Sequence, residues 1–294
     1  MNILFSFLLL LSFQDAPNFE FQYNLDKPTR VMMLEHPKLD EISGLSPAPV
    51  TGELCAISDE SGDVYFLNSQ TGTVVRSLSF RLTGDFEGVE WTGTCLYAMK
   101  SDGDLFEIDQ YEGDHSSYVL HKTPLKKEQD IEGLCYDPKR NALLMVSKGK
   151  PESPMSRNVY AFDLKNKQFQ EKPVFTWDPE QVEATRKKNK TPVKDKDGKD
   201  KDKDKEKEKE DKEYFSPSGI AIHPVTGHVY VISSAKRRLA VFDPADGTIL
   251  HVQKLDKDLF PQPEGICFFP DGVMYISSEG KGGKGRILVF HPQG

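Results

Sequence analysis

The sequence predicts an all-β protein, a five-bladed β-propeller with four-stranded antiparallel blades. A short phrase that ends in Gly and an apolar residue occurs five times along the chain, with glycines separated by 44, 45, 86 and 46 residues. A repeat of about 45 residues is typical of one propeller blade. The aligned glycines are Gly44, Gly88, Gly133, Gly219 and Gly265.

The long third step contains an insertion. Residues 181–213 are dominated by Lys, Asp and Glu and offer almost no apolar side chain for burial, so we expect them to be disordered. Removing these 33 residues from the step of 86 leaves 53, close to one further repeat. Residues 16–294 are therefore expected to form one propeller domain interrupted by this charged segment.

Each repeat contains the segments that a blade needs. A short apolar strand follows the glycine, and two strands rich in β-branched and aromatic residues come next, separated by turns with Gly, Asp and Pro. In the first repeat these two are LCAIS from Leu54 and VYFLN from Val64. The last repeat stops after its third strand, and residues 29–34 (TRVMML) precede the first repeat. We expect this N-terminal strand to complete the last blade and close the ring.

The composition narrows the classes of function. A net charge of −8 argues against a nucleic-acid surface, which requires clustered basic residues. The apolar run Met1–Phe13 is short for a membrane span and lies where a secretory signal lies. We expect residues 1–15 to be a signal peptide and the protein to be exported, periplasmic or extracellular, and monomeric. An uncleaved segment that packs on the domain or anchors it to a membrane is the alternative.

Four cysteines could form two disulfides in an exported protein. However, Cys135 and Cys267 occupy the same place in different repeats, and Cys55 and Cys95 also fall in different blades. We therefore expect all four to be small buried apolar residues.

Polar residues recur just before the aligned glycines. Because side chains of a strand alternate, residues one and three positions before the glycine should share a face, and the first strand of each blade lines the central channel. The resulting prediction is two rings of side chains at the channel mouth. The inner ring is Ser43, Glu87, Glu132, Ser218 and Glu264, and the outer ring is Glu41, Asp85, Asp130, Ser216 and Gln262.

The ends of the second strands should lie near the same mouth. This places Asp59, Glu60 and Glu279 at its rim, where Lys100 and Lys148 could neutralise part of the charge. Close carboxylates raise each other's pKa, recruit cations or bind donors of a ligand. An all-oxygen set suits Ca²⁺, and the lack of His and Cys in either ring counts against zinc, copper or haem iron. Alternatively, these polar residues hydrogen-bond the neighbouring blade and hold the ring together.

The repeated phrases EISGL, DFEGV, DIEGL, SPSGI and QPEGI, together with ISDESGDVYFL and QPEGICFFPDGVMYISSEG, resemble the SdiA-regulated, or YjiK-like, propeller family from about Glu41 to Phe290. The resemblance implies a five-bladed propeller, distantly related to NHL-repeat proteins, with a calcium site and no established catalytic activity. It also implies Glu87, Glu132 and Glu264 as metal ligands, with Glu279 and Glu60 as further candidates. The charged insertion departs from that family.

No Ser, Cys or His nucleophile arrangement stands out, and the histidines lack metal-ligand spacing. We therefore expect a non-catalytic binding module, stabilised by Ca²⁺, that takes a protein or a small polar ligand at the channel mouth. The alternative is a metal-dependent hydrolase, a lactonase or phosphoesterase, in which a central cation activates water and a carboxylate acts as base. A structural interaction domain with a water-filled channel is a third reading.

Overall fold

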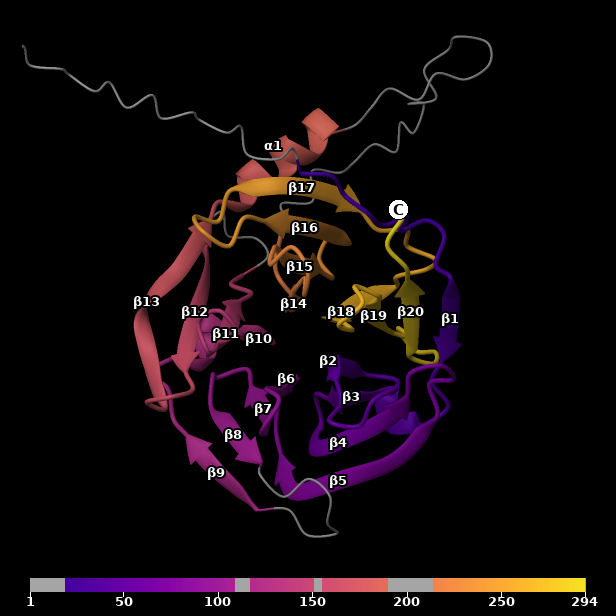
Figure 1. Ribbon diagram of the computed structural model, residues 1–294, viewed down its shortest axis with the longest axis vertical. Coiled ribbons are helices and arrows are strands. Elements are labelled where there is room, and N and C mark those ends of the chain that lie inside the picture. The colour runs from indigo at the N-terminus through magenta and orange to yellow at the C-terminus, as the bar shows by residue number, and fades with distance from the viewer. Residues whose placement is uncertain (1–18, 109–116, 151–154, 190–213, 294) are drawn as a thin grey trace, which may run out of the picture.

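The computed structural model describes residues 19–108, 117–150, 155–189 and 214–293. Five antiparallel sheets of four strands stand around a central axis and form a disc (Figure 1). The predicted five-bladed propeller is confirmed. The signal peptide expected at residues 1–15 lies outside the described residues.

In the first two blades the order of the strands in the sheet is their order along the chain. Blade 1 consists of β2 (Ile42–Pro47), β3 (Glu53–Ser58), β4 (Ser61–Asn68) and β5 (Val74–Thr83). Blade 2 consists of β6 (Phe86–Trp91), β7 (Leu96–Lys100), β8 (Leu105–Ile108) and β9 (Tyr118–His121). Two short 3₁₀ helices, Pro37–Leu39 and Lys127–Gln129, precede blades 1 and 3.

The next two blades have the same order, with the helix α1 (Pro179–Asn189) between them. Blade 3 consists of β10 (Ile131–Asp137), β11 (Ala142–Ser147), β12 (Arg157–Asp163) and β13 (Gln168–Trp177). Blade 4 consists of β14 (Gly219–Ile222), β15 (Val229–Ser233), β16 (Arg238–Phe242) and β17 (Ile249–Lys254).

Blade 5 joins the two ends of the chain. Its inner strands are β18 (Gln262–Phe268), β19 (Met274–Glu279) and β20 (Arg286–Phe290), and its outer strand is β1 (Arg30–Met33). β1 pairs antiparallel with β20, so that Arg30 lies opposite Val289. The predicted closure of the ring by the N-terminal strand is therefore confirmed.

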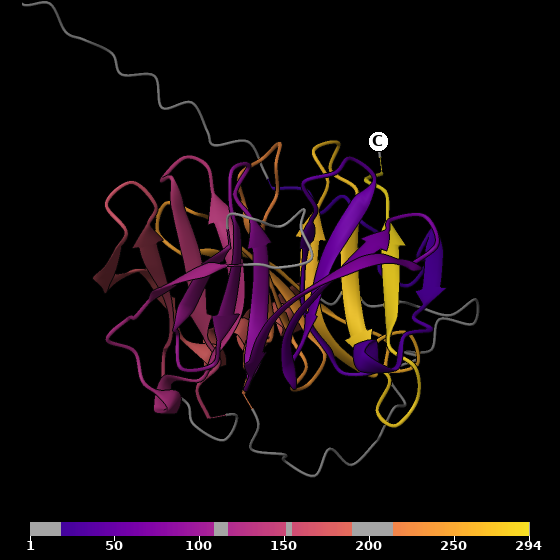
Figure 2. The ribbon, with the colours of Figure 1, turned by 90° about the horizontal axis from the view of Figure 1, so that it is seen from below.

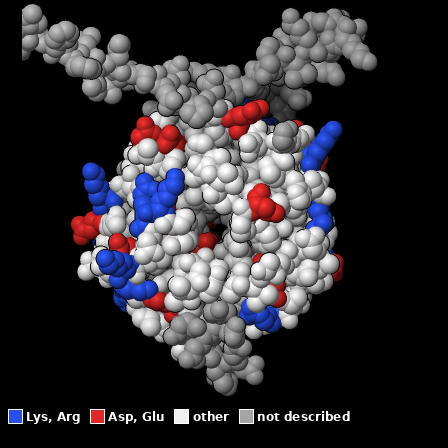
Figure 3. Space-filling view, viewed as in Figure 1, with Lys and Arg blue, Asp and Glu red and all other residues white. Residues whose placement is uncertain are grey.

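The first strands of the blades are the innermost ones (Figure 1). We call the side of the disc where they begin the mouth face, and the opposite side, where they end, the C-terminal face. Strand β20 runs parallel to β18, so the chain also ends on the C-terminal face, at the top of Figure 2. Figures 1 and 3 look onto this C-terminal face.

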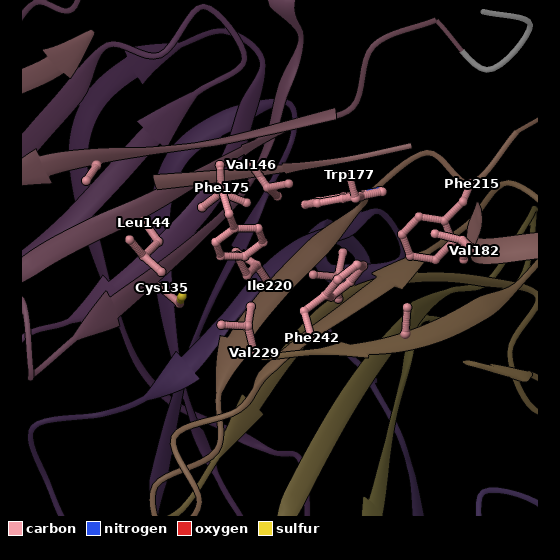
Figure 4. Close-up of a cluster of buried hydrophobic side chains, with 14 of the residues drawn as sticks. Cys135, Leu144, Val146, Phe175, Trp177, Val182, Phe215, Ile220, Val229 and Phe242 are labelled. Carbon is pink, nitrogen blue, oxygen red and sulfur yellow. The ribbon is translucent and has the colours of Figure 1, made fainter. Parts of the chain in front are cut away.

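The core lies between blades. The second strands β11 and β15 are buried along their whole length, as nearly continuous apolar runs require. Figure 4 shows the cluster between blades 3 and 4, where Trp177 packs on Phe242 with ring centroids 4.7 Å apart. Each blade thus buries its apolar faces against its neighbours, which explains why the repeats are stable only together.

Five aligned glycines form the narrowest part of the ring. A Cβ atom on Gly44 would lie 2.8 Å from the Val89 nitrogen of the next blade, and one on Gly219 would lie 2.3 Å from the Glu264 carbonyl oxygen. Such distances are shorter than carbon can approach these atoms, so any side chain there would push neighbouring first strands apart. The recurrent glycine is therefore required by close backbone approach.

Part of the charged insertion is ordered, contrary to expectation. Residues 181–189 belong to α1, which packs against β17. The helix begins after Asp178, whose Oδ1 accepts a hydrogen bond from the Glu180 backbone at 2.8 Å. Val182 is fully buried, and Glu183 pairs with Arg186. These contacts stabilise the helix although its composition is highly charged. Residues 190–213 lie outside the described residues.

An N-terminal arm, residues 19–25, lies across blades 4 and 5. Its alternate residues Phe19, Phe21, Tyr23 and Leu25 pack on the cluster between these blades. The Phe21 ring stacks on His251 with centroids 4.3 Å apart. The arm therefore adds an aromatic seal beside the strand that closes the ring.

The four cysteines are free thiols. Cys55, Cys135 and Cys267 are buried as expected, whereas Cys95 is half-buried at the start of β7. In the part of the chain that the structure describes, no helix is both long enough and apolar enough to cross a bilayer.

Candidate functional site: an acidic central channel

The inner ring predicted from the sequence lines one cavity. Ser43, Glu87, Glu132, Ser218 and Glu264 all border the constriction that the five glycines form. The cavity has a volume of about 10 Å³, which is room for about one water molecule or ion. The channel is thus a narrow polar site at the constriction.

Local backbone geometry directs these side chains inward. The register between the first and second strands shifts between Phe86 and Gly88, and again between Ile131 and Gly133. Glu87 and Glu132 are therefore the extra residues of β-bulges, a feature that turns a side chain away from its regular face. The same shift occurs in blade 1 at Ser43 and in blade 5 around Glu264.

The three glutamates carry unfavourable charge when they are ionised. Burial raises the pKa of Glu87 far above its ordinary value, and the carboxylates of Glu132 and Asp85 raise it further. Burial also raises the pKa of Glu264 well above its usual range, with Glu132 contributing. The channel therefore holds protons on carboxyl groups that are ionised in water, which is the behaviour of a site short of positive charge.

Lys148 supplies one positive charge. Its Nζ lies 2.7 Å from Glu132 Oε1, and the Glu132 side chain is only 7% exposed. Burial raises the pKa of Glu132 while the Lys148 ammonium opposes that rise. The pKa of Lys148 itself is raised by Glu132, against the effect of its own burial. The expectation that Lys148 neutralises part of the charge is confirmed.

Lys100 behaves differently. Its ammonium donates to the Thr83 carbonyl oxygen at 2.8 Å and lies over the Phe86 ring, with the nitrogen 5.0 Å from the ring centroid. It therefore contacts a backbone carbonyl and an aromatic face in place of a carboxylate.

The outer ring does not form a second layer in the constriction. Glu41 and Asp85 are exposed on the mouth face, Asp130 and Gln262 are half-buried there, and Ser216 is buried away from the channel. The bulges explain the difference, because one extra residue breaks the alternation that would place positions one and three on a common face. Asp85 accepts a hydrogen bond from the Ser101 hydroxyl at 2.6 Å, and its carboxylate is close enough to raise the pKa of Glu87.

The rim residues meet different partners. Glu60 pairs with Lys38 at 2.9 Å, and both side chains are more than half exposed. Glu279 Oε2 accepts a hydrogen bond from Gln262 Nε2 at 2.7 Å, and burial with Asp59 nearby raises the pKa of Glu279 to about 7. Burial raises the pKa of Asp59, and the nearby carboxylate of Glu41 raises it further. The mouth is therefore acidic and only partly neutralised.

The donor set suits a hard cation in its chemistry, but not in its present arrangement. Carboxylate and hydroxyl oxygens are the ligands that Ca²⁺ prefers. Among the described residues, however, no three Asp, Glu, His or Cys side chains are close enough together to hold a metal ion. The assignment of Glu87, Glu132 and Glu264 as metal ligands remains a prediction.

The structural reading of the ring also has support. The Ser218 hydroxyl donates to the Pro263 carbonyl oxygen of the next blade at 2.7 Å. Ser218 thus links blades 4 and 5, as expected for a residue that holds the ring together.

One acidic residue of the first strands was not singled out from the sequence. Glu90, two positions after Gly88, lies at the C-terminal end of the channel, where burial raises its pKa to about 8. The available signal was its position in the repeat, which Ser46, Cys135, Ala221 and Cys267 share. Figure 3 shows a small opening at the centre of this face with acidic atoms visible in it.

Fold and site together define a β-propeller with a narrow, acidic central channel. The sequence model of the SdiA-regulated family matches residues 19–281, and the chain belongs to that family. No curated protein sequence matches the chain.

Solved structures share the fold at low sequence identity. Glutaminyl cyclase from Myxococcus xanthus is 14% identical, with 91% of this chain and 96% of that chain covered and a TM-score of 0.54. The PQQ-bound aldose sugar dehydrogenase from Streptomyces coelicolor is 14% identical, with 90% and 97% covered and a TM-score of 0.52. These likenesses concern the fold alone, because propellers host many functions.

Proposed function

We propose that this protein is a non-catalytic, exported binding module whose channel mouth takes a small cation, with Ca²⁺ as the expected ion. The observation that carries the proposal is the convergence of Glu87, Glu132 and Glu264 on one constriction, where burial and then the neighbouring carboxylates raise the pKa of Glu87 and of Glu264. A cation would relieve this repulsion directly. The protein or polar ligand would then bind at the acidic rim around the ion.

The present arrangement sets conditions on such binding. The Lys148 ammonium is paired with the Glu132 carboxylate, so a cation must displace that ammonium or bind beside it. Burial raises the pKa of Glu87 and that of Glu264, so both groups favour the protonated form and a cation must also compete with protons there. Cation binding is therefore expected to release protons and to tighten as the pH rises.

The test is calorimetric titration of the mature protein with Ca²⁺ in two buffers that differ in ionisation enthalpy. We expect saturable binding, proton release, and a higher melting temperature with Ca²⁺ than with a chelator. The variant Glu87→Gln/Glu132→Gln/Glu264→Gln should lose all three effects. Its matched control is Glu128→Gln/Glu171→Gln/Glu180→Gln, which makes the same three substitutions at exposed positions.

Two outcomes would contradict the proposal. Calcium binding that is equal in both triple variants would place the ion elsewhere, and no binding at any pH up to 9 would leave the glutamates with a structural role. Hydrolysis of lactones or phosphate esters that depends on Ca²⁺ and on Glu87 would instead support the hydrolase alternative. Export is tested separately, by determining the N-terminal residue of the protein isolated from its native host.

A further inference from the structure

A second cavity opens on the C-terminal face, away from the carboxylates of the mouth. Its volume is about 230 Å³, and it lies between the β10–β11 turn of blade 3 and the β14–β15 turn of blade 4. Pockets that enclose drug-sized ligands measure roughly 300–1,000 Å³, so this one suits a smaller molecule. Residues that form it include Glu90, Tyr136, Pro138, Ile222, Pro224 and Pro244.

The end of the cavity nearest the channel is formed by Glu90, which comes from the first strand of blade 2. Its carboxyl group hydrogen-bonds the Ser46 side chain of blade 1 and the Tyr136 backbone of blade 3, and both contacts partly offset the rise in its pKa. Among the described residues no Lys or Arg side chain pairs with it. Glu90 is thus a half-buried carboxyl group without a charged partner among the residues that the structure describes.

The remaining walls are mostly apolar and held in place, although Asp137, Lys139, Arg140 and His223 also contribute to the lining. Arg140 bridges the two blades, because its guanidinium pairs with Asp137 at 2.5 Å and donates to the Pro244 carbonyl oxygen at 2.9 Å. The β14–β15 turn is fixed by His223, whose Nδ1 accepts hydrogen bonds from the Val225 and Thr226 backbones. The positive charge of Arg140 is therefore already matched, and the cavity is preformed.

We propose that this cavity binds a small organic amine, with its ammonium group at Glu90 and its apolar body between the prolines of the two turns. A shielded carboxyl group at the end of an apolar cavity gains most from a ligand that brings a positive charge, because the pair then forms away from water. Lys139 lies at the rim and is exposed to solvent. A ligand that carried a carboxylate would find that cation, so the two classes of ligand can be distinguished.

The binding step balances in protons. Glu90 is largely protonated at pH 7, since its pKa is about 8, and a primary amine is protonated at that pH. When the ammonium group binds, the Glu90 carboxyl group gives up its proton to the buffer. Binding should therefore release up to one proton per amine, and the apparent affinity should rise between pH 6 and pH 9.

The experiment compares three probes of similar shape, namely phenethylamine, 2-phenylethanol and phenylacetate, by NMR titration of the full mature chain. We expect phenethylamine to bind saturably, at least tenfold more tightly than 2-phenylethanol, and phenylacetate to bind least. Tightest binding of phenylacetate would overturn the proposal in favour of the Lys139 rim. Saturation by none of the three would also overturn it.

Two variants locate the site. Glu90→Gln should weaken phenethylamine binding at least tenfold and abolish proton release. Val225→Trp should obstruct the cavity from a turn position whose side chain is exposed. The matched control is Glu279→Gln, which removes a carboxylate from the mouth face and should leave amine binding unchanged. An amine that is lost in Glu279→Gln but retained in Glu90→Gln belongs to the mouth, and that result would refute this inference while leaving the proposed cation site intact.

Discussion

The Lys148 ammonium lies 2.7 Å from Glu132 Oε1 inside the channel, where it is the one lysine found paired with an inner-ring glutamate among the described residues. This contact both stabilises the fold and competes with any cation that would bind there. The two roles can be separated, because they respond in opposite directions to removal of the lysine.

We expect Lys148→Met to lower the free energy of unfolding by about 1–3 kcal/mol, the usual cost of leaving a buried charged group without its partner. The same variant should bind Ca²⁺ more tightly, because Glu132 is then available. Urea unfolding and calorimetry measure the two effects, with the exposed Lys257→Met as control. Weaker Ca²⁺ binding in Lys148→Met would contradict competition at Glu132.

Glu87→Gln should stabilise the protein at neutral pH. The folded-state pKa of Glu87 is raised, so its contribution to stability is fully present below pH 4.5 and is lost as the pH rises. Between pH 4.5 and the folded-state pKa of Glu87, each pH unit lowers the free energy of unfolding by about 1.4 kcal/mol. Unfolding free energies measured from pH 5 to 8 should fall less steeply in Glu87→Gln than in the parent protein. Parallel curves would show that Glu87 is ionised in the folded channel.

Gly219→Ala should destabilise the ring by about 2–3 kcal/mol, because the added Cβ would lie 2.3 Å from the Glu264 carbonyl oxygen. Gly283→Ala is the matched control, since its Cβ would meet nothing closer than 3.4 Å. Thermal unfolding compares the two variants. Equal melting temperatures would mean that blades 4 and 5 can move apart at the constriction without cost.

His223 should stay neutral at pH values below its ordinary pKa of 6.5. Its Nδ1 accepts two backbone hydrogen bonds, so Nε2 carries the proton and donates to the Tyr23 hydroxyl at 2.8 Å. Burial lowers the pKa of His223, so its contribution to stability is present above pH 6.5 and is lost as the pH falls. NMR titration of the imidazole signals would show this. A His223 midpoint at or above 6.5 would contradict this hydrogen-bond assignment.

Much of the fold could be predicted because each repeat is marked in the sequence by an aligned glycine and by apolar strand segments. The five aligned glycines mark the constriction itself, and residues 29–34 indicated the strand that closes blade 5. The helix α1 was missed because the Lys and Glu content of residues 181–189 concealed its signals. The pair Asp178–Pro179 is a typical helix start, and Val182 is the buried anchor.

The candidate site was predicted in part, for a definite physical reason. Period two placed Glu87, Glu132 and Glu264 on the channel, and the structure brings them there. The same period placed Glu41, Asp85 and Asp130 in a second layer of the channel. The structure has them outside the constriction on the mouth face, with Asp85 still close enough to raise the pKa of Glu87, because a bulge changes the face and the residue pattern does not reveal it. The cavity beside Glu90 depends on two turns from different blades, and a spacing along one chain does not show which turns meet.

The pairing of β1 with β20 joins residues near the two ends of the chain, Arg30 and Val289. During synthesis the N-terminal strand emerges first, yet it finds its partner only after the last blade has been made. A chain cut short anywhere before β20 leaves Met32 and Leu34 without the part of their core that Ile287 and Val289 supply. The ring therefore makes completeness a condition of stability, and prematurely terminated chains would be exposed to proteolysis while finished ones are protected.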